Sequence, residues 1–328
     1  MIPQRALLLV VGLITLAFAA VPLLFGTYAI YVGAEILIFI IFALAFNLML
    51  GQGGLVSFGH AAYFAIASYG VAILLTTYNW PFIPAFFGGI ALSTVAALVI
   101  GYFCVRLTEI YFAMLTLAFS QLVWAIAFQW QPVTGGDEGF IGVAVPQWLV
   151  EPANFYYFAL VVTLICGGLL WLIAHSAFGR VLRATKENAQ RAEFLGVNVR
   201  QVRLVTFVLS GTFTGVAGAL FALFNRSVFV ESAWWTKSAE VLIMSILGGV
   251  GSFFGPALGA AVMIVLDRVI TEYTEYWPTV LGIILLLVLF FLPNGLIGLF
   301  TKAHGDTSAA AHPDPKKEVS DAVDQRPL

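Results

Sequence analysis

Charged residues are scarce in this chain of 328 residues, where Asp, Glu, Lys and Arg together make up 10%. In an average soluble domain these four residue types make up about a quarter. Hydrophobic residues reach 61%, and the formal net charge is −2. This composition excludes an ordinary soluble domain, and the small net charge gives no sign of nucleic-acid binding.

Residues that commonly carry catalysis or hold metals are also few. The two cysteines, Cys104 and Cys166, both lie inside apolar runs, so we expect two small buried side chains and no structural disulfide. The four histidines show no spacing typical of metal ligands, and the chain has no G-x-x-x-x-G-K-[ST] phosphate-binding loop. We therefore expect no catalytic residue, metal site or cofactor, and we predict that the chain is not an enzyme.

Long apolar stretches are abundant instead. A helix needs about 20 mostly apolar residues to span a bilayer. Ten stretches are near that length, and we expect a membrane-spanning helix at each of them: 6–25, 30–50, 60–77, 82–105, 110–130, 154–174, 204–224, 238–250, 255–271 and 277–292. The first stretch resembles a secretory signal, but its apolar run continues to Phe25 and more spans follow, so we interpret it as a span.

This pattern predicts an all-α membrane protein, a polytopic helical bundle of about ten transmembrane helices. The bundle forms one transmembrane domain over residues 1–302, with a polar loop at 175–203. Residues 303–328 are polar and rich in Ala, Asp, Pro and Lys, so we expect a disordered tail.

The positions of Lys and Arg predict the orientation of the bundle. Short loops rich in these residues face the cytosol. With ten spans, the basic residues of the loop and the tail fall on one side, together with Arg5 and Arg106. The loop contributes Arg180, Arg183, Lys186, Arg191, Arg200 and Arg203, and the tail contributes Lys302, Lys316, Lys317 and Arg326. We therefore predict that the loop, the tail and both termini are cytosolic.

Two glycine-rich segments interrupt the apolar runs. Gly51–Gly59 follows the second stretch and Gly248–Pro256 follows the eighth, and each continues with Phe-Gly-x-Ala into another helix. Non-helical backbone at membrane depth often lies beside the substrate path of a transporter. The alternative is a tight turn in which small residues pack closely. Both segments face the cytosol under the predicted orientation, so their similarity would be a direct repeat.

The polar loop itself predicts a helix from Gly179 to Gly196. Arg183 with Glu187, and Glu187 with Arg191, lie four residues apart and are expected to pair. An apolar strip is expected on the other face, and Asn198 is placed to cap the following helix. Such a helix either lies on the lipid surface, connects two spans, or inserts into a groove on a soluble subunit. The strip consists of Leu182, Ala189, Ala192 and Leu195.

The sequence of this loop resembles a known family. Phe178–Asn188 and Ala192–Val199 resemble the coupling loop of permeases from ATP-binding-cassette importers, most closely the LivM-type permeases of branched-chain amino acid transporters. Arg191 and Phe194 stand where that family often has small residues. Further similar segments, within a resemblance that covers about residues 30 to 300, are Asn47–Leu48, Gly51–Ala62, Tyr111–Phe119, Thr134–Gly136, Gly248–Ser252 and Leu292–Leu296.

The resemblance implies a permease subunit of the cell inner membrane that passes branched-chain or related amino acids inward by alternating access. It also implies the partners: a second homologous permease, two cytosolic ATPase subunits and an extracytoplasmic substrate-binding protein. Residues that the resemblance places against an ATPase are Arg180, Arg183, Lys186, Glu187, Asn188, Ala192, Glu193 and Gly196.

Uncharged polar residues and one histidine lie among the apolar stretches. They either line the substrate pathway or form hydrogen bonds between helices. These candidates are Asn47, Gln52, Ser57, His60, Thr116 and Gln121. Charged residues near the predicted helix ends, namely Glu35, Glu240, Asp267 and Arg268, are expected to be solvated at the membrane interface.

The scarcity of deep charges favours an ATP-driven permease, because ion-coupled carriers commonly keep buried carboxylates. Three alternatives remain open on the sequence. They are a urea or short-amide permease of the same family, an ion-coupled carrier or channel that acts alone, and a membrane scaffold that transports nothing.

Overall fold

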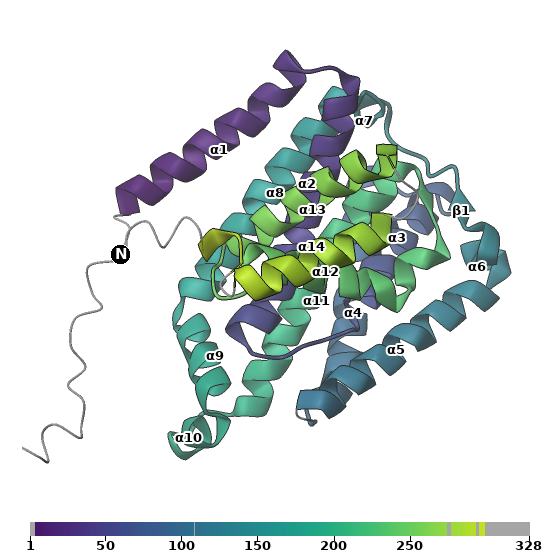
Figure 1. The fold of residues 1–328 in the computed structure, drawn as a ribbon. Helices are drawn as coiled ribbons and strands as arrows, with labels where there is room; N and C mark the ends of the chain where they lie inside the picture. Colours follow the sequence, from purple (N-terminus) through teal and green to yellow (C-terminus); the bar gives the residue numbers. More distant parts are fainter. Residues whose placement is uncertain (1–3, 108, 274–276, 293–294, 299–328) are drawn as a thin grey trace, which may run out of the picture.

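Helices at all ten predicted apolar stretches form the bundle. The computed structural model describes residues 4–107, 109–273, 277–292 and 295–298. The tail at 303–328 lies outside the described residues, and the division into a domain and a tail stays a prediction. The helices at the ten stretches are α1 Gln4–Leu24, α2 Thr27–Asn47, α3 His60–Thr76, α4 Phe82–Cys104, α5 Glu109–Gln129, α8 Pro152–His175, α11 Val199–Asn225, α12 Trp235–Gly248, α13 Gly255–Tyr273 and α14 Trp277–Phe291 (Figure 1).

The helices differ in whether they can cross a membrane alone. Five segments are long and apolar enough: Thr27–Gln52, Phe82–Cys104, Ile110–Gln129, Pro152–His175 and Val199–Asn225. Helices α12 and α14 have 14 and 15 residues, which is shorter than the roughly 20 that a span needs. The fold class, an all-α membrane bundle, is therefore confirmed, while the number of ten spans stays a prediction.

Helices α2 and α11 form the centre of the bundle. In the segments Thr27–Gln52 and Val199–Asn225, 72% of the most apolar 18 residues are buried inside the chain. Helix α11 packs mainly against α3, α4 and α2. The contact with α3 is very close: a Cβ atom on Gly218 would lie 2.1 Å from the backbone oxygen of Phe64. Ser68 donates to the carbonyl oxygens of both residues, at 2.7 and 2.8 Å, so small and hydroxyl residues hold these backbones together.

The same kind of contact joins α12 to α13. A Cβ atom on Gly248 would lie 1.8 Å from the backbone oxygen of Gly255, and one on Gly259 would lie 1.9 Å from that of Met244. Helices α12 and α13 therefore cross with their backbones in contact. Helix α12 has only 14 residues to contact its neighbour. Close approach strengthens the dispersion attraction between the two helices, because more atoms come into contact as the axes approach.

Short elements cover one end of the bundle. Between α5 and α8 lie α6 Gln131–Thr134, the 3-10 helix η2 Gly136–Glu138, β1 Phe140–Ile141 and α7 Gln147–Val150. Between α11 and α12 lie β2 Ser227–Val228 and the 3-10 helix η3 Val230–Ala233. Strands β1 and β2 pair antiparallel, with Phe140 opposite Val228. The opposite end of the bundle carries α9 and α10 (Figure 1).

The two cysteines are placed where the sequence predicts. Cys104 ends α4 and Cys166 lies within α8, and both side chains are buried. Burial among apolar neighbours keeps a thiol protonated and inert.

Candidate functional site

Two short helices project from one end of the bundle in place of the single predicted helix. They are α9 Ala177–Glu187 and α10 Ala189–Phe194 (Figure 1). The prediction of one helix is wrong at Asn188, whose backbone is extended and whose Oδ1 accepts the amide of Arg191 at 2.8 Å. Asparagine is a favoured helix N-cap, so it starts a second helix here. The predicted cap at Asn198 is confirmed, because its Oδ1 accepts the amide of Gln201 at 3.1 Å.

The predicted ion pairs within this loop are also wrong. Arg183 donates to Oε1 of Gln52 at 2.8 Å and to the carbonyl oxygen of Ala174 at 3.0 Å. Lys186 donates to the carbonyl oxygen of Gly51 at 2.8 Å. Glu187 is exposed and forms no ion pair with any residue in the described ranges.

Arg183 and Lys186 bond to other residues because those hydrogen bonds contribute more free energy than an exposed ion pair on the helix. An exposed ion pair on a helix contributes about 0.3–0.5 kcal/mol, because water already solvates both charges. A hydrogen bond from a charged group to a poorly solvated oxygen contributes about 1.5–3 kcal/mol. Gln52 and Gly51 belong to a π-helical turn, η1 Leu48–Gln52, which continues α2. The long cations of α9 therefore attach this helix to the end of α2.

The two glycine-rich segments meet at the same place. The amide nitrogen Nδ2 of Asn47 donates to the carbonyl oxygen of Ser252 at 3.2 Å. A Cβ atom on Gly51 would lie 2.6 Å from the carbonyl oxygen of Val250. This contact agrees with the close-packing interpretation of the segments. The site thus combines the end of α2, helix α9 and the turn between α12 and α13.

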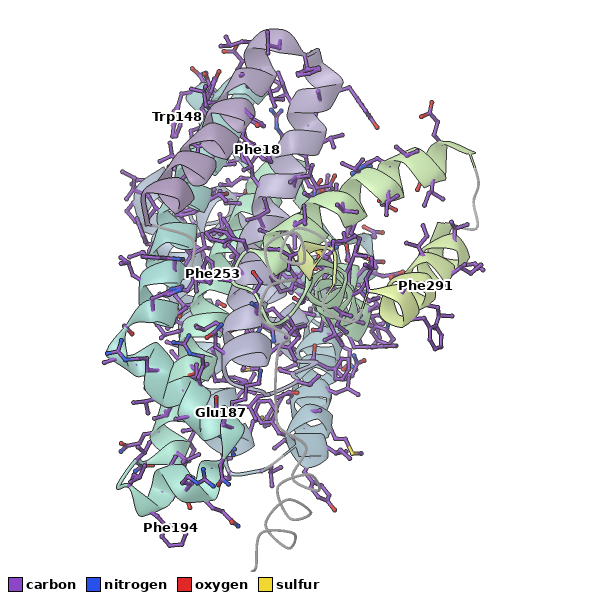
Figure 2. All side chains as sticks on the ribbon, turned by 60° about the vertical axis from the view of Figure 1, so that its left-hand side comes forward. Phe18, Trp148, Glu187, Phe194, Phe253 and Phe291 are labelled. Atoms are coloured by element: carbon purple, nitrogen blue, oxygen red, sulfur yellow. The ribbon has the colours of Figure 1, made fainter. Side chains whose placement is uncertain are left out.

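The outer tip of the loop carries two exposed apolar side chains. Phe194 is 91% exposed and Leu195 is 81% exposed, and Figure 2 shows Phe194 at the far end of the projection. The predicted apolar strip is therefore wrong at Leu195, although Leu182 and Ala192 are buried as expected. Large exposed apolar residues at the tip of a polar loop are typical of a protein contact.

Sequence reasoning did not single out Phe194 and Leu195 as candidate contact residues. The available signal was a pair of large apolar residues directly before Gly196, at the end of a short polar helix. Gly196 adopts a φ of +85°, which turns the chain back toward α11 and leaves the pair at the apex. The eight predicted contact residues differ in exposure. Exposed are Arg180, Lys186, Glu187, Asn188, Glu193 and Gly196, whereas Arg183 is half-buried and Ala192 is buried.

Five of the six polar candidates for the pathway are buried within this chain and hydrogen-bonded there. Besides Asn47 and Gln52, Ser57 accepts the amide of Gly59 at 3.1 Å, and His60 bonds Ser210 at 2.8 Å. The hydroxyl of Thr116 accepts the amide of Phe58 at 3.2 Å and donates to the carbonyl oxygen of Ala113 at 2.8 Å. These bonds surround the start of α3 and stabilise it.

Gln121 differs from the other five. It is half-buried and lines a cavity of about 330 Å³ with Leu117, Trp234 and Trp235. A role in the pathway stays a prediction for all six residues, and Gln121 is the one among them beside a described cavity.

Three of the four charged residues near helix ends form ion pairs, whereas Asp267 accepts a hydrogen bond from Thr271 at 3.5 Å. Glu35 of α2 accepts from Nε of Arg268 on α13 at 3.2 Å. Lys237 of α12 pairs with Glu240 at 2.7 Å, and its ammonium lies 4.5 Å from the ring centroid of Phe39. Pairing lowers the cost of holding charges on apolar helices. The pair between Glu35 and Arg268 also joins α2 to α13.

One prediction follows from the attachment of α9 to α2. Replacing Arg183 by methionine keeps an apolar stem but leaves Oε1 of the buried Gln52 without its charged partner. Losing one partner of a buried hydrogen bond costs about 1–3 kcal/mol. We therefore expect amide hydrogen exchange in residues 177–187 to become about 5- to 150-fold faster, measured by mass spectrometry on the full chain in detergent.

Arg180 supplies the matched control for this change. Its guanidinium reaches only the exposed carbonyl oxygen of His175, at 3.4 Å. Arg180→Met should leave exchange in α9 nearly unchanged. Equal exchange in the two variants would contradict the attachment.

Comparison with known proteins identifies the family. Residues 9–290 match the family model described as branched-chain amino acid transport system / permease component. The chain is 27% identical over 320 residues to the high-affinity branched-chain amino acid transport system permease protein LivM of Escherichia coli, covering 88% of this chain and 74% of the relative.

Two further relatives extend the comparison. The LivH permease protein of Salmonella typhimurium is 25% identical over 78% of this chain and 90% of its own length. The autoinducer 2 import system permease protein LsrC of Salmonella paratyphi B is 32% identical over 46% of this chain and 43% of its own. No solved structure matches the chain. The match to the family model covers most of the sequence, and the chain therefore belongs to the family of branched-chain amino acid transport permease components.

Proposed function

We propose that this chain is the membrane permease subunit of an ATP-binding-cassette importer and passes branched-chain or related amino acids into the cell. The family match and the names of the relatives LivM and LivH support the class of substrate. The projecting loop of α9 and α10, with exposed Phe194 and Leu195 at its tip, carries the proposal. A polar loop with an apolar apex suits a groove on a separate soluble subunit.

The orientation of the bundle is part of the same proposal. The end that carries α9 and α10 would face the cytosol, because basic residues gather in this loop. Both termini would lie on that side of the cell inner membrane. The end covered by β1, β2 and α7 would then face the substrate-binding protein.

The contacts at the loop suggest how a motor would drive it. Closure of two ATPase subunits would push on α9 and α10. The hydrogen bonds of Arg183 and Lys186 would carry this displacement to the end of α2. The loop also continues directly into α8 on one side and α11 on the other. Movement of the loop would thus reorient α8 and the two central helices α2 and α11, as alternating access requires.

A reconstitution experiment tests the function. The chain, a second permease, the two ATPase subunits and the binding protein are placed in liposomes, and uptake of leucine, isoleucine, valine and urea is measured with and without ATP. We expect ATP-dependent uptake of the branched-chain amino acids. Preferred uptake of urea would support the short-amide alternative. Uptake by this chain alone under an ion gradient would support a stand-alone carrier or channel.

The coupling role is tested in the same assembly. Replacing both Glu187 and Gly196 should lower substrate-stimulated ATPase activity, because both are exposed on the loop and Gly196 shapes its apex. Unchanged stimulation would count against the loop as the ATPase contact.

A further inference from the structure

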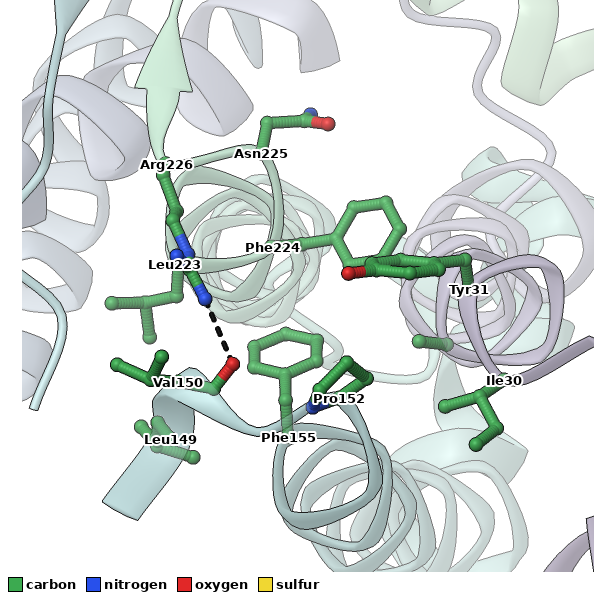
Figure 3. A pocket seen from close by; sticks show the side chains of 11 residues that line it. Ile30, Tyr31, Leu149, Val150, Pro152, Phe155, Leu223, Phe224, Asn225 and Arg226 are labelled. Carbon is green, nitrogen blue, oxygen red and sulfur yellow. Dashed lines mark hydrogen bonds between the residues drawn. The ribbon is translucent and has the colours of Figure 1, made fainter. Parts of the chain in front are cut away.

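A cavity lies at the end of the bundle opposite α9 and α10. Its volume is about 270 Å³, and it opens between the start of α2, the start of α8 and the end of α11. Figure 3 shows its aromatic walls, in which the ring of Phe224 lies 6.0 Å from that of Tyr31 and 5.7 Å from that of Phe155. Arg226 and Asn225 supply polar groups at the same cavity. The hollow therefore combines aromatic walls with polar groups that can orient a ligand, as small-molecule sites do.

Arg226 is held in this cavity by an unusual backbone. Its φ is +52°, in the left-handed region that residues other than glycine and asparagine seldom adopt. Its carbonyl oxygen accepts the amides of Gly142 and Val143 at 3.1 and 3.0 Å. Its Nη2 donates to the carbonyl oxygen of Val150 at 2.8 Å, the dashed line in Figure 3. This left-handed residue ends α11, as is common at helix C-termini, and the hydrogen bonds hold its side chain at the cavity.

The guanidinium of Arg226 has donors left for a ligand. A guanidinium carries five N–H donors, and the hydrogen bond to Val150 uses one of them. A planar fork of donors matches a carboxylate, which accepts two parallel hydrogen bonds. Its fixed side chain lowers the entropy cost of such binding.

From these features we propose that the cavity binds a small carboxylate with an apolar chain. The carboxylate would bond Arg226, and the chain would lie against Phe155 and Phe224. The lining residues that the structure describes include no Asp or Glu, so an ammonium group on the ligand would stay near the solvent opening. The site therefore accepts branched-chain amino acids but does not require their amino group.

The cavity borders the two helices that flank the loop of α9 and α10. The start of α8 and the end of α11 border the cavity, and α9 and α10 lie between the other ends of these two helices. A bound carboxylate would thus contact the two helices that flank the loop. The assignment of this end to the extracytoplasmic side rests on the proposed function, whereas binding itself does not.

Binding is measured on the full chain in zwitterionic-lipid nanodiscs, by calorimetry and by saturation-transfer NMR. The ligands are leucine, 4-methylvalerate, which lacks the ammonium, and leucinamide, which lacks the carboxylate. We expect leucine and 4-methylvalerate to bind and leucinamide to bind at least about tenfold more weakly, the loss typical of a charged hydrogen bond. Equal affinity for leucinamide, or no binding of leucine, would overturn the proposal without touching the ATPase contact.

A substitution locates the site. Arg226→Asn removes the guanidinium while keeping a residue that tolerates the left-handed backbone, and should weaken leucine binding at least about tenfold. Arg106→Asn removes another exposed arginine, at the end of α4, and should leave binding unchanged. Equal binding by Arg226→Asn and the parent would overturn the assignment. The leucinamide comparison uses the unmodified chain, so it decides the question even if Arg226→Asn misfolds.

A lipid headgroup is the competing source of an anion at this position. The measurement is repeated in nanodiscs that contain anionic lipid. Leucine binding that persists supports the proposal. Binding that disappears, together with anionic lipid that is retained by the parent and lost from Arg226→Asn, would assign the cavity to lipid instead.

Discussion

Replacing Phe194 by glutamate is expected to abolish ATP-driven transport while the bundle stays folded. The side chain is 91% exposed, so its removal costs the fold almost no packing. Aromatic anchors at the centre of an interface contribute about 2–4 kcal/mol, and a buried unpaired carboxylate adds a penalty. The ATPase subunits should therefore bind about 30- to 1000-fold more weakly.

Co-purification with the ATPase subunits and substrate-stimulated ATP hydrolysis measure this effect. Ile141→Glu is the matched control, because Ile141 is 71% exposed on β1 at the opposite end of the bundle. It should leave both measurements unchanged. Normal ATPase binding by the Phe194 variant would show that the apex of the loop is not the contact.

The largest expected effect on stability follows from the contact between α3 and α11. Gly218→Ala adds one carbon, and that carbon would lie 2.1 Å from the backbone oxygen of Phe64. Backbone in the middle of two packed helices cannot move aside as a flexible side chain does. Overpacking of well-packed cores costs typically 1–3 kcal/mol, and we expect a loss of about 3 kcal/mol or more in the free energy of unfolding.

Gly168→Ala is the control for this change. Gly168 also lies inside a helix, α8, but a Cβ atom there would have no neighbour within 4 Å. It should leave the melting temperature in detergent unchanged or raise it slightly, since alanine is a better helix former. If Gly218→Ala melts at the same temperature as Gly168→Ala, the α3 and α11 backbones do not touch as described.

The helices of the bundle were predictable from sequence because one physical constraint decides them. Backbone groups inside a membrane must be satisfied within the segment, so an apolar run of sufficient length becomes a helix. The positions of the apolar stretches therefore located all ten helices to within a few residues. It did not decide how many of them cross the membrane, because α12 and α14 are short and owe their position to contacts with other helices.

The candidate site was less predictable because distant residues form it. The rule for pairs four residues apart suggested that Arg183 bonds Glu187, but Gln52, 131 residues away, is its partner. No local pattern contains that information. Asn188 is a different case: the preference of asparagine for helix N-caps was visible in the sequence, and the run of helix-forming residues around it concealed the break.

Arg226 had no signal in the sequence at all. Nothing about an arginine after Asn225 indicates a left-handed backbone, which here results from hydrogen bonds to Gly142 and Val143 in another segment. The family resemblance predicted a loop for the proposed ATPase contact, but the cavity at the other end required the structure.

The burial of Cys104 and Cys166 has a practical consequence for spectroscopy. A single cysteine introduced at an exposed position, such as Gln190 in α10 or Ile141 in β1, would be far more accessible to a maleimide reagent than either native thiol. Fluorophores or spin labels can thus be attached at either end of the bundle without first removing the natural cysteines, and each half of the transport cycle can be followed in the otherwise unaltered protein.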